Sequence, residues 1–431
     1  MPKEIFVHVD LEEKTHFVGR LFVHERHGRE SVSFEYSSQW RSSLVCFPLE
    51  PALILGAGAY HTDKALFGSI GDSAPDRWGR TLMNRLEARR AILENRAARM
   101  LKESDYLLMV DDRTRQGALR FSTEKTGLFL ASYRDTCIPP LIQLVKLLNA
   151  SSRIITHEEL DQDLRDLVEP GSSLGGARPK AVVLDTNSNL LIAKFPSPKD
   201  EWDVELWEFL SLRMAKKAGI PVPGFRLVQV LEKNVLLLNR FDRTKNNLRV
   251  PFLSAMSMLG ASDGETRTYL EIADAIQAYG ANATQDLADL WRRIVFNVMV
   301  SNVDDHLRNH GFLYQGISGW RLSPIYDLEP TPEHVKARIL RTNIDFNNPT
   351  ASLDLAFSVA DFFGLKPAQA RKIAKKVGEA VKNWDKEAAR LGAGRQEIEF
   401  MRSAFDHGDL RKALADKTIV AFDVCSGICG E

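Results

Sequence analysis

The sequence predicts an α+β protein, and three observations support that class. Apolar and polar residues alternate in short runs over residues 5–55, which is typical of strands. Two further pairs of aliphatic runs, each pair joined by a short polar loop, lie within residues 181–243. Beyond residue 243 the apolar residues recur mostly at helical spacing. We therefore expect a β-rich N-terminal module, a mixed central region and a helical C-terminal region.

Charge and hydropathy exclude two broad classes. The chain has 431 residues, and its 57 Lys and Arg balance its 57 Asp and Glu, so the formal net charge is zero. This argues against a protein that binds nucleic acid over its whole surface, because such binding needs a net excess of cations. No apolar run approaches the roughly 18 residues of a membrane span, and the acidic N-terminal stretch lacks the apolar core of a signal peptide. We expect a cytoplasmic protein with no membrane partner.

The elements follow in order along the chain. The runs FVHVD, HFVGRLFVH and VSFEYS predict the first strands. A helix is expected after SAPDRWGR, with Ser73 as its cap and Pro75 in its first turn. AVVLD and LLIAKF, joined by TNSN, predict a hairpin, and FRLVQVLEKNVLLLNRF predicts a second one. Between the hairpins, residues 203–217 predict a helix that Gly219 caps and Pro221 terminates.

The C-terminal region is predicted from a buried helical stripe. Trp291, Ile294, Val295 and Val298 keep the i, i+3, i+4, i+7 spacing of a helix, which runs into SNVDDHLRNHG. GFLYQ and WRLSPIYD predict one short hairpin, and Asp327 is expected at the end of its second strand. The remaining residues are predicted to be helical.

The first candidate for chemistry is the glycine-rich stretch GSSLGGAR, residues 171–178. Glycines let the backbone approach an anion closely, and successive N–H groups in such a turn form a concave nest for phosphate oxygens. The stretch does not match a Walker loop, because no Lys-Ser or Lys-Thr pair ends it. A plain surface turn is the alternative.

Lys194 is the second candidate, since it is a lone lysine in an apolar strand. It either extends from a sheet face into water or points toward an anion. The predicted helix that follows carries Glu205 and Glu208, and either could pair with it. Glycine-rich loop, strand lysine and helix glutamate come in the order that protein kinases use to hold the α- and β-phosphates of ATP.

The third candidate is the segment 301–311, in which Asp304 and Asn309 are five residues apart. That is the interval between the base and the metal-binding amide in a kinase catalytic loop. Asp327 could hold Mg²⁺ between the carboxylates and the phosphates, and Asp304 would then deprotonate the attacking hydroxyl. The alternatives are a charged interhelical loop with a capping aspartate and an Asx-turn at Asp327.

A competing metal site could use two histidines and one carboxylate from the same segment, namely Asp305, His306 and His310. No predicted strand or helix spacing brings those groups together. His306 could instead hold the loop in shape.

Taken together, these motifs resemble the HipA family of bacterial serine/threonine kinases, the toxins of toxin–antitoxin pairs. The resemblance covers nearly the whole chain and lies in the segments 74–80, 105–121, 172–181, 190–196, 238–243, 302–313 and 322–332. It implies a bilobal protein-kinase-like fold with an added β-rich N-terminal subdomain and an all-helical C-terminal lobe. The implied domains are 1–122, the N-terminal subdomain; 123–243, the N-lobe with the phosphate loop; and 244–431, the mostly helical C-lobe with the catalytic loop.

The resemblance also implies roles. Asp304 matches the catalytic base, Lys194 the ATP lysine with Glu208 as its partner, and Ser173 the loop serine whose autophosphorylation switches the enzyme off. Asn309 and Asp327 match the Mg²⁺ ligands. Further nucleotide contacts are expected from Ser172, Ser173, Leu174, Gly175, Gly176, Asn239, Phe241 and His306. Many relatives carry glutamate at Asn239 and a glutamine–glutamate pair at Arg178 and Pro179, so the chain departs from the family pattern there.

The implied cofactors are ATP and Mg²⁺. The implied partners are a HipB-like helix-turn-helix antitoxin, through which the toxin reaches operator DNA, and a protein substrate such as an aminoacyl-tRNA synthetase. Two other functions stay open at this point. One is a low-turnover co-repressor partner of the antitoxin, and the other is a small-molecule phosphotransferase, since antibiotic and inositol-lipid kinases share the Asp–x4–Asn spacing. The N-terminal module and the loop serine favour a protein substrate.

Overall fold

The computed structural model describes residues 3–125, 128–130, 138–168 and 176–415. Its N-terminal part is an antiparallel sheet with the strand order β4-β3-β2-β1-β5. The strands are β1 Lys3–Leu11, β2 Lys14–Arg26, β3 Arg29–Tyr36, β4 Ala59–His61 and β5 Leu119–Ser122. Ile5, Val7 and Val9 are fully buried on one face, as the alternation predicts. The predicted β-rich module is therefore present.

The helix expected after SAPDRWGR begins four residues later than its predicted cap. Helix α3 spans Arg77–Leu93, and the Asp76 side chain caps it by accepting from the Gly79 N–H at 2.8 Å. Pro75 precedes the helix. Ser73 lies just after the short helix α2, Gly68–Gly71, and its N–H donates to the carbonyl oxygen of Ile70. A carboxylate that reaches an unpaired first-turn N–H sets the start, so the assignment of Ser73 as cap was wrong.

The central sheet is antiparallel and has the order β6-β7-β9-β8. Its strands are β6 Lys180–Leu184, β7 Leu190–Lys194, β8 Phe225–Val230 and β9 Lys233–Asn239, so both predicted hairpins are confirmed. Helix α7, Val204–Ala218, lies between them in sequence. The Asp203 side chain caps its first turn, and Gly219 ends it in the left-handed region with φ of 83°. The predicted helix is confirmed.

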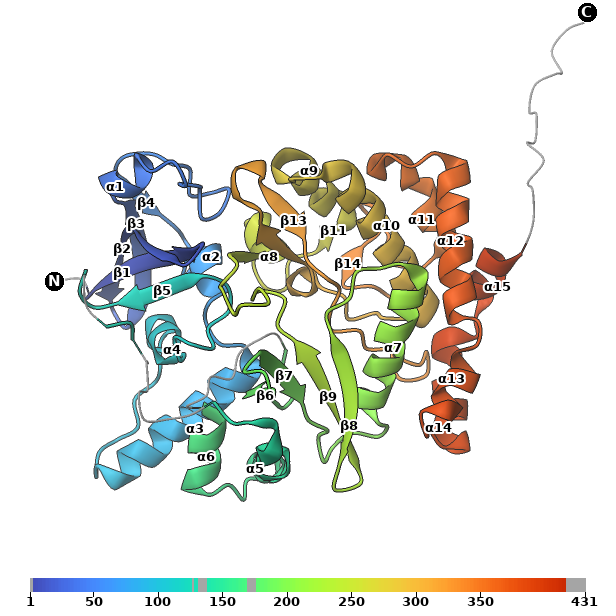
Figure 1. The fold of residues 1–431 in the computed structure, drawn as a ribbon, viewed down its shortest axis with the longest axis horizontal. Helices are drawn as coiled ribbons and strands as arrows, with labels where there is room; N and C mark the ends of the chain where they lie inside the picture. The colour runs from blue at the N-terminus through green and yellow to red at the C-terminus, as the bar shows by residue number, and fades with distance from the viewer. Residues whose placement is uncertain (1–2, 126–127, 131–137, 169–175, 416–431) are drawn as a thin grey trace, which may run out of the picture.

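Four helices share a core with this sheet. They are α3, α4 Glu103–Met109, α5 Leu144–Thr156 and α6 Asp161–Val168. The core joins Leu82 of α3 and Leu164 of α6 to Ala193 and Leu237 of the sheet. Figure 1 shows these helices below the N-terminal sheet and beside the central one. The predicted boundary at residue 122 stays a prediction.

The C-terminal lobe is mostly helical but not all-helical. Its helices are α8 Ala255–Met258, α9 Tyr269–Tyr279, α10 Ala283–Val300, α11 Leu353–Ser358, α12 Pro367–Val381, α13 Trp384–Arg390, α14 Arg395–Phe405 and α15 Gly408–Leu414. Two small sheets accompany them, formed by β10 Phe252–Ser254, β12 Gly311–Tyr314 and β13 Trp320–Leu322, and by β11 Arg267–Thr268 with β14 Thr342–Asn343. The predicted hairpin is β12 and β13, whereas β10 was missed because it is only three residues long.

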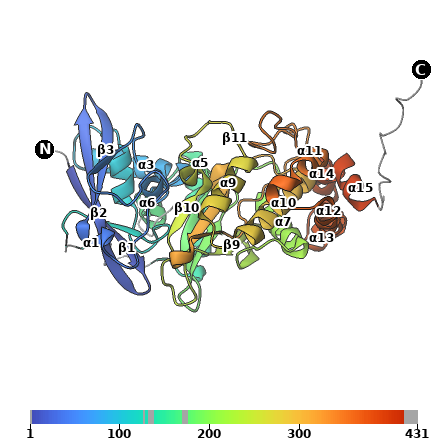
Figure 2. The same ribbon diagram turned by 90° about the horizontal axis from the view of Figure 1, so that it is seen from above.

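Helix α10 is the centre of this lobe, and Figures 1 and 2 show it between α9 and α12. Trp291, Ile294, Val295 and Val298 are fully buried, as the helical spacing predicts. The helix ends at Val300, and the C-cap residue Ser301 adopts the left-handed conformation with φ of 50°. That turn directs the chain into the segment with Asp304 and Asn309.

A buried ionic cluster joins the N-terminal part to the chain between the lobes. The Asp242 carboxylate accepts from the Gly117 N–H at 2.7 Å, from Arg240 at 2.6 and 2.7 Å and from Arg243 at 2.8 Å. Both guanidinium groups also donate to the carbonyl oxygen of Arg115, at 3.2 and 2.7 Å. The two arginines hold the pKa of Asp242 well below its usual range despite burial.

Among the described helices, none is long and apolar enough to cross a membrane.

Candidate active site

Lys194 lies at the end of β7 and binds two carboxylates. Its Nζ is 2.7 Å from both carboxylate oxygens of Glu208 on α7 and 2.7 Å from Oδ1 of Asp327. The Lys194 and Glu208 side chains are almost fully buried, and the Asp327 side chain is 22% exposed. The structure therefore places three of the residues predicted for the site in direct contact.

The charges in this cluster shift one another's pKa. Burial alone would lower the pKa of Lys194, but Asp327 and Glu208 raise it above its usual value. Burial would raise the pKa of Asp327, but Lys194 and Lys180 lower it to about 2. Burial raises the pKa of Glu208 and outweighs the effect of Lys194. The cluster therefore brings one lysine into contact with two carboxyl groups whose pKa values are shifted in opposite directions.

Asp327 was expected at the end of a strand, and the structure corrects that assignment. Strand β13 ends at Leu322, and Pro324 then removes a backbone donor. Asp327 itself has φ of 61°, in the left-handed region where a non-glycine residue is uncommon. The carboxylate is thus presented by an irregular segment, which reaches Lys194 in the other lobe.

The segment around Asp327 is tied to the predicted catalytic loop. The Tyr326 hydroxyl donates to the carbonyl oxygen of Arg308 at 2.6 Å, and the Glu329 N–H donates to the side chain of Asn302 at 3.3 Å. These contacts place the segment that carries Asp327 against the loop that carries Asp304 and Asn309.

Asp304 is half exposed and binds two cations that sequence reasoning missed. Its Oδ1 is 3.0 Å from Nζ of Lys336 and 3.1 Å from Nε of Arg341. Both residues follow Asp327 in sequence, and no spacing pattern marks them. Asn309 donates its Nδ2 to the carbonyl oxygen of Asp304 at 3.4 Å, so its amide oxygen is the atom that can bind a cation.

Asp305 anchors the segment of Asp304 and Asn309 to the buried side chains of the C-terminal lobe. Its Oδ2 accepts from the Tyr269 hydroxyl at 2.5 Å, from Asn297 Nδ2 at 2.8 Å and pairs with His310 Nε2 at 2.8 Å. Because Asp305 and His310 bind each other in the buried core, they are not arranged as the alternative metal site. No group of three or more metal-binding side chains is found in the described part of the chain. His306 begins the 3₁₀ turn Leu307–Asn309 and adds to the lowering of the pKa of Asp327.

The two residues expected near the adenine lie between the lobes. Phe241 packs on the ring of Tyr326 with centroids 5.4 Å apart, next to Asp327 in sequence. Asn239 is exposed at the end of β9, where its N–H donates to Gly224 at 2.7 Å. Their contacts with a nucleotide stay predictions.

Four of the predicted loop residues, Ser172, Ser173, Leu174 and Gly175, lie outside the described residues. Gly176 is described, with φ of 91°. A Cβ at this position would lie 3.3 Å from Nζ of Lys180 and 3.8 Å from Oδ2 of Asp327. The end of the glycine-rich stretch therefore lies next to the cluster of Lys194, Glu208 and Asp327. A side chain at position 176 would fill the space beside that cluster.

Lys180 is a site residue that sequence reasoning missed. It pairs with Lys194 across β6 and β7, so the two lysines share one face of the sheet. Its Nζ binds the capping carboxylate of Asp76 at 2.9 Å, and the side chain is almost fully buried. The loop of this hairpin is residues 185–189, one residue longer than the expected TNSN, and the shorter loop would have paired Ala181 with Lys194 instead, so sequence reasoning could not identify Lys180.

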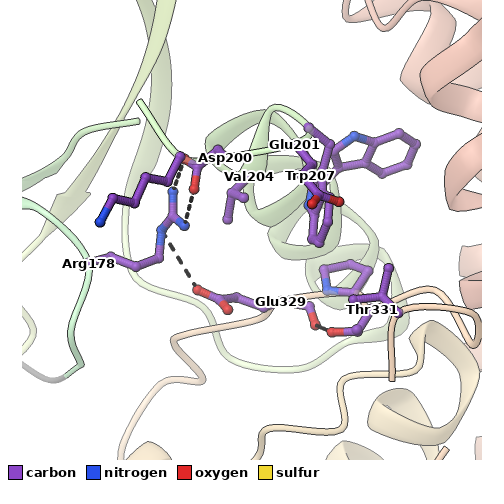
Figure 3. A pocket seen from close by; sticks show the side chains of 11 residues that line it. Arg178, Asp200, Glu201, Val204, Trp207, Glu329 and Thr331 are labelled. Carbon is purple, nitrogen blue, oxygen red and sulfur yellow. Dashed lines mark hydrogen bonds and ion pairs between the residues drawn. The ribbon is translucent and has the colours of Figure 1, made fainter. Parts of the chain in front are cut away.

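A cleft of about 360 Å³ opens beside the cluster between the two lobes. Figure 3 shows it, with Arg178, Asp200 and Glu329 on one side and Trp207 and Thr331 on the other. Its lining comes from the end of the glycine-rich stretch, from the start of α7 and from the chain that follows Asp327. The cleft therefore lies where those three elements meet.

Comparison with known proteins gives a family. Residues 172–384 match the model of the HipA-like C-terminal domain. A protein of Haemophilus influenzae with a provisional kinase name is 27% identical over 198 residues, which are 40% of this chain and 57% of that protein. Y4dM of Sinorhizobium fredii, which also has a provisional kinase name, is 27% identical over 143 residues, 30% of this chain and 34% of that protein. The matches thus span less than two thirds of either relative.

A solved structure supports the fold over nearly the whole chain. The complex of HipA, HipB and operator DNA from the toxin–antitoxin system of Shewanella oneidensis contains a similar chain, with a TM-score of 0.67 and 17% identity. The similarity covers 95% of this chain and 96% of that one. The fold class expected from the sequence, a mixed helix and sheet protein like the kinases, is therefore confirmed. With this fold and the lysine–carboxylate cluster between its lobes, residues 172–384 form a HipA-like C-terminal domain.

Proposed function

We propose that this protein is a HipA-like kinase that transfers the γ-phosphate of ATP, in the presence of Mg²⁺, to a serine or threonine hydroxyl of a protein. The observation that carries the proposal is the contact of Lys194 with Glu208 and Asp327 beside the loop of Asp304 and Asn309. A strand lysine held by a helix glutamate, next to a metal-binding carboxylate, is the arrangement that phosphoryl transfer from a nucleotide needs.

The residues at this position fit a magnesium ion with a nucleotide. Asp327 offers a carboxylate with a pKa of about 2, so it is ionised at neutral pH, and Asn309 offers an amide oxygen. Mg²⁺ prefers hard oxygen donors, and one or two protein ligands with substrate phosphates complete its shell. When bound, the metal supplies charge neutralisation between the carboxylates and the phosphates.

The chain's own residues then divide the work. Lys194 donates to phosphate oxygens, and Glu208 holds its ammonium group in position. Gly176 and its neighbours let the backbone approach the phosphates, because no Cβ fills the space above the cluster. Asp304 accepts the proton of the substrate hydroxyl while the hydroxyl oxygen forms a bond to the γ-phosphorus. The bond between the γ-phosphorus and the β,γ-bridging oxygen breaks at the same time, and ADP is released.

The substrate and partners of the proposed kinase follow from the sequence resemblance and from the solved complex. An aminoacyl-tRNA synthetase is the protein substrate that the resemblance suggests, and Ser173 is the proposed site of inactivating autophosphorylation. The Shewanella structure, which holds HipA with HipB and operator DNA, supports a HipB-like antitoxin as partner. The zero net charge fits a protein that reaches DNA through that antitoxin, in the cytoplasm.

Intact-mass measurement of the purified protein before and after incubation with Mg-ATP tests the kinase proposal. We expect a gain of one phosphate group that peptide mapping places on Ser173, and no gain for Asp304→Ala. Asp274→Ala, which removes an exposed aspartate of α9, is the matched control and should label like the parent. Equal labelling of Asp304→Ala and the control would refute the assigned base, and no gain in any variant, with phosphate-free starting protein, would refute the kinase.

A co-repressor role with little turnover is the second candidate, because the Shewanella complex shows a similar chain in a DNA-bound assembly. Co-expression with a HipB-like helix-turn-helix protein, followed by size-exclusion chromatography, tests the partnership. A stable complex with both the parent and Asp304→Ala would show that partner binding does not need catalysis. Separate elution of the two proteins would rule this partner out.

A further inference from the structure

Arg178 binds a group of carboxylates at the edge of the cleft. Its Nη1 and Nη2 donate to the two oxygens of Asp200 at 2.9 and 2.6 Å, and Nη2 also donates to Oε1 of Glu205 at 2.9 Å. Its Nε lies 4.0 Å from Oε1 of Glu329, as Figure 3 shows. Glu205, the other candidate partner of Lys194, is therefore committed to Arg178 instead.

Each partner of Arg178 belongs to an element that carries a site residue. Asp200 and Glu205 lie just before and in the first turn of α7, one turn from Glu208. Glu329 is two residues beyond Asp327. Arg178 itself is two residues beyond Gly176, which covers the cluster. A single side chain thus connects the glycine-rich stretch, the glutamate helix and the metal-binding segment.

The contacts of Arg178 with Asp200 and Glu205 are charge-assisted hydrogen bonds, whereas its contact with Glu329 is an ion pair without a hydrogen bond. A guanidinium group that binds a carboxylate through two parallel hydrogen bonds fixes both position and angle. The Glu205 side chain is only 1% exposed, and its Oε2 has no hydrogen-bond partner in the described residues. Without Arg178 this anion would be buried with no counter-charge, so the first turn of α7 would have to move. The Nε of Arg178 also has no hydrogen-bond partner there, and Oε1 of Glu329 lies 4.0 Å from it.

We propose that Arg178 is a positioning residue that fastens residues 176–178 to the start of α7 and, through Glu329, to the segment of Asp327. The proposal rests on the proposed kinase function and adds to it a residue that touches no reacting atom. Its effect falls on nucleotide binding, because the backbone over the cluster and the helix that aims Lys194 both depend on it. Among the described residues, no hydrogen bond or ion pair joins Arg178 to Asp304 or its loop, so we expect the chemical step to be unaffected.

Arg178→Gln tests the proposal, with Arg213→Gln as its matched control. Arg213 is on α7 as well, and its Nη2 donates to Oε2 of Glu387 at 3.2 Å, but this contact is away from the cleft. We expect Arg178→Gln to raise KM for Mg-ATP between about 10-fold and 100-fold, as displaced binding groups do, with kcat within about threefold of the parent. Arg178→Lys, which keeps the charge but loses the paired hydrogen bonds, should give an intermediate KM. Arg213→Gln should leave KM unchanged.

Hydrogen exchange separates failure of this proposal from failure of the kinase proposal. In Arg178→Gln we expect faster exchange at residues 176–180 and 200–206 and parent-like exchange around Arg213. A fall in kcat at constant KM, with equal loss of thermal stability in both variants, would show a merely structural role. Unchanged exchange at 176–180 and 200–206 would overturn the fastening role. If the parent neither labels nor binds ATP, the kinase proposal fails, and the exchange result still decides whether Arg178 joins these elements.

Discussion

Replacing Asp327 by asparagine should weaken the protein in two separable ways. The substitution keeps the shape of the side chain and removes its charge. The pKa of Asp327 is about 2 against an ordinary 3.8, a difference of about 1.8 pH units, so its ionised form is stabilised in the folded state. At about 1.36 kcal/mol for each unit, the charge contributes about 2 kcal/mol to the free energy of unfolding. Because the folded pKa is the lower one, this contribution is complete above pH 3.9 or so and is lost as the pH falls toward 2.

Urea unfolding at pH 7.5, with and without Mg-ATP, measures both effects. We expect Asp327→Asn to lose about 2 kcal/mol without ligand. The parent should gain about 2.7 kcal/mol at a ligand concentration of 100 Kd, and the variant should lose most of that gain. Asp274→Asn, on the exposed face of α9, is the control, because it removes one aspartate charge away from the site. A variant as stable as the parent would refute the electrostatic reasoning, and an undiminished gain from Mg-ATP would refute Asp327 as a metal ligand.

Three further predictions concern other residues. Asp304→Ala should slow phosphate labelling by about 10²- to 10⁴-fold while ATP binding, followed by fluorescence titration, stays near the parent's. Asp242→Asn should cost about 3–5 kcal/mol in urea unfolding, because it leaves two buried guanidinium groups without a counter-ion; a loss under 1 kcal/mol would contradict the buried cluster. Burial and Arg338 lower the pKa of His407 to about 4 from 6.5, so its contribution is complete above pH 6.5 and is lost as the pH falls toward 4. Between pH 7.5 and 5 the parent should therefore lose about 2 kcal/mol more stability than His407→Gln does, and equal losses would contradict the shift.

The local structure was largely predictable because it depends on short patterns. The alternation in residues 5–55 and the helical spacing around Trp291 each reflect one buried face, and both elements are present. The capping signals at Gly219 and Pro221 fixed the end of α7. The start of α3 was missed because Ser73 and Asp76 are both good caps, and only the folded geometry decides which oxygen reaches the first turn.

The site was predictable where the order of motifs carries information and not where tertiary contacts decide. Lys194 and Asp327 were identified from their order along the chain, and the family resemblance pointed to Glu208 over Glu205; the structure brings the three into contact. The cations on Asp304, Lys336 and Arg341, come from an irregular segment without periodicity. The left-handed backbone at Asp327 likewise follows from the packing of that segment between the lobes and not from its own residues.

The ionic cluster around Asp242 makes the N-terminal sheet part of the structure that joins the lobes. The stretch that supplies the Gly117 N–H and the carbonyl oxygens of residues 113–117 runs straight into β5, an edge strand of that sheet. A chain shortened to begin after residue 122 would keep Arg240 and Arg243 but lose the oxygens that solvate them. The kinase-like region would then carry two poorly compensated cations in the chain between its lobes. The first 122 residues therefore stabilise the chain between the two lobes, and a cut at residue 122 would remove hydrogen-bond acceptors from Arg240 and Arg243.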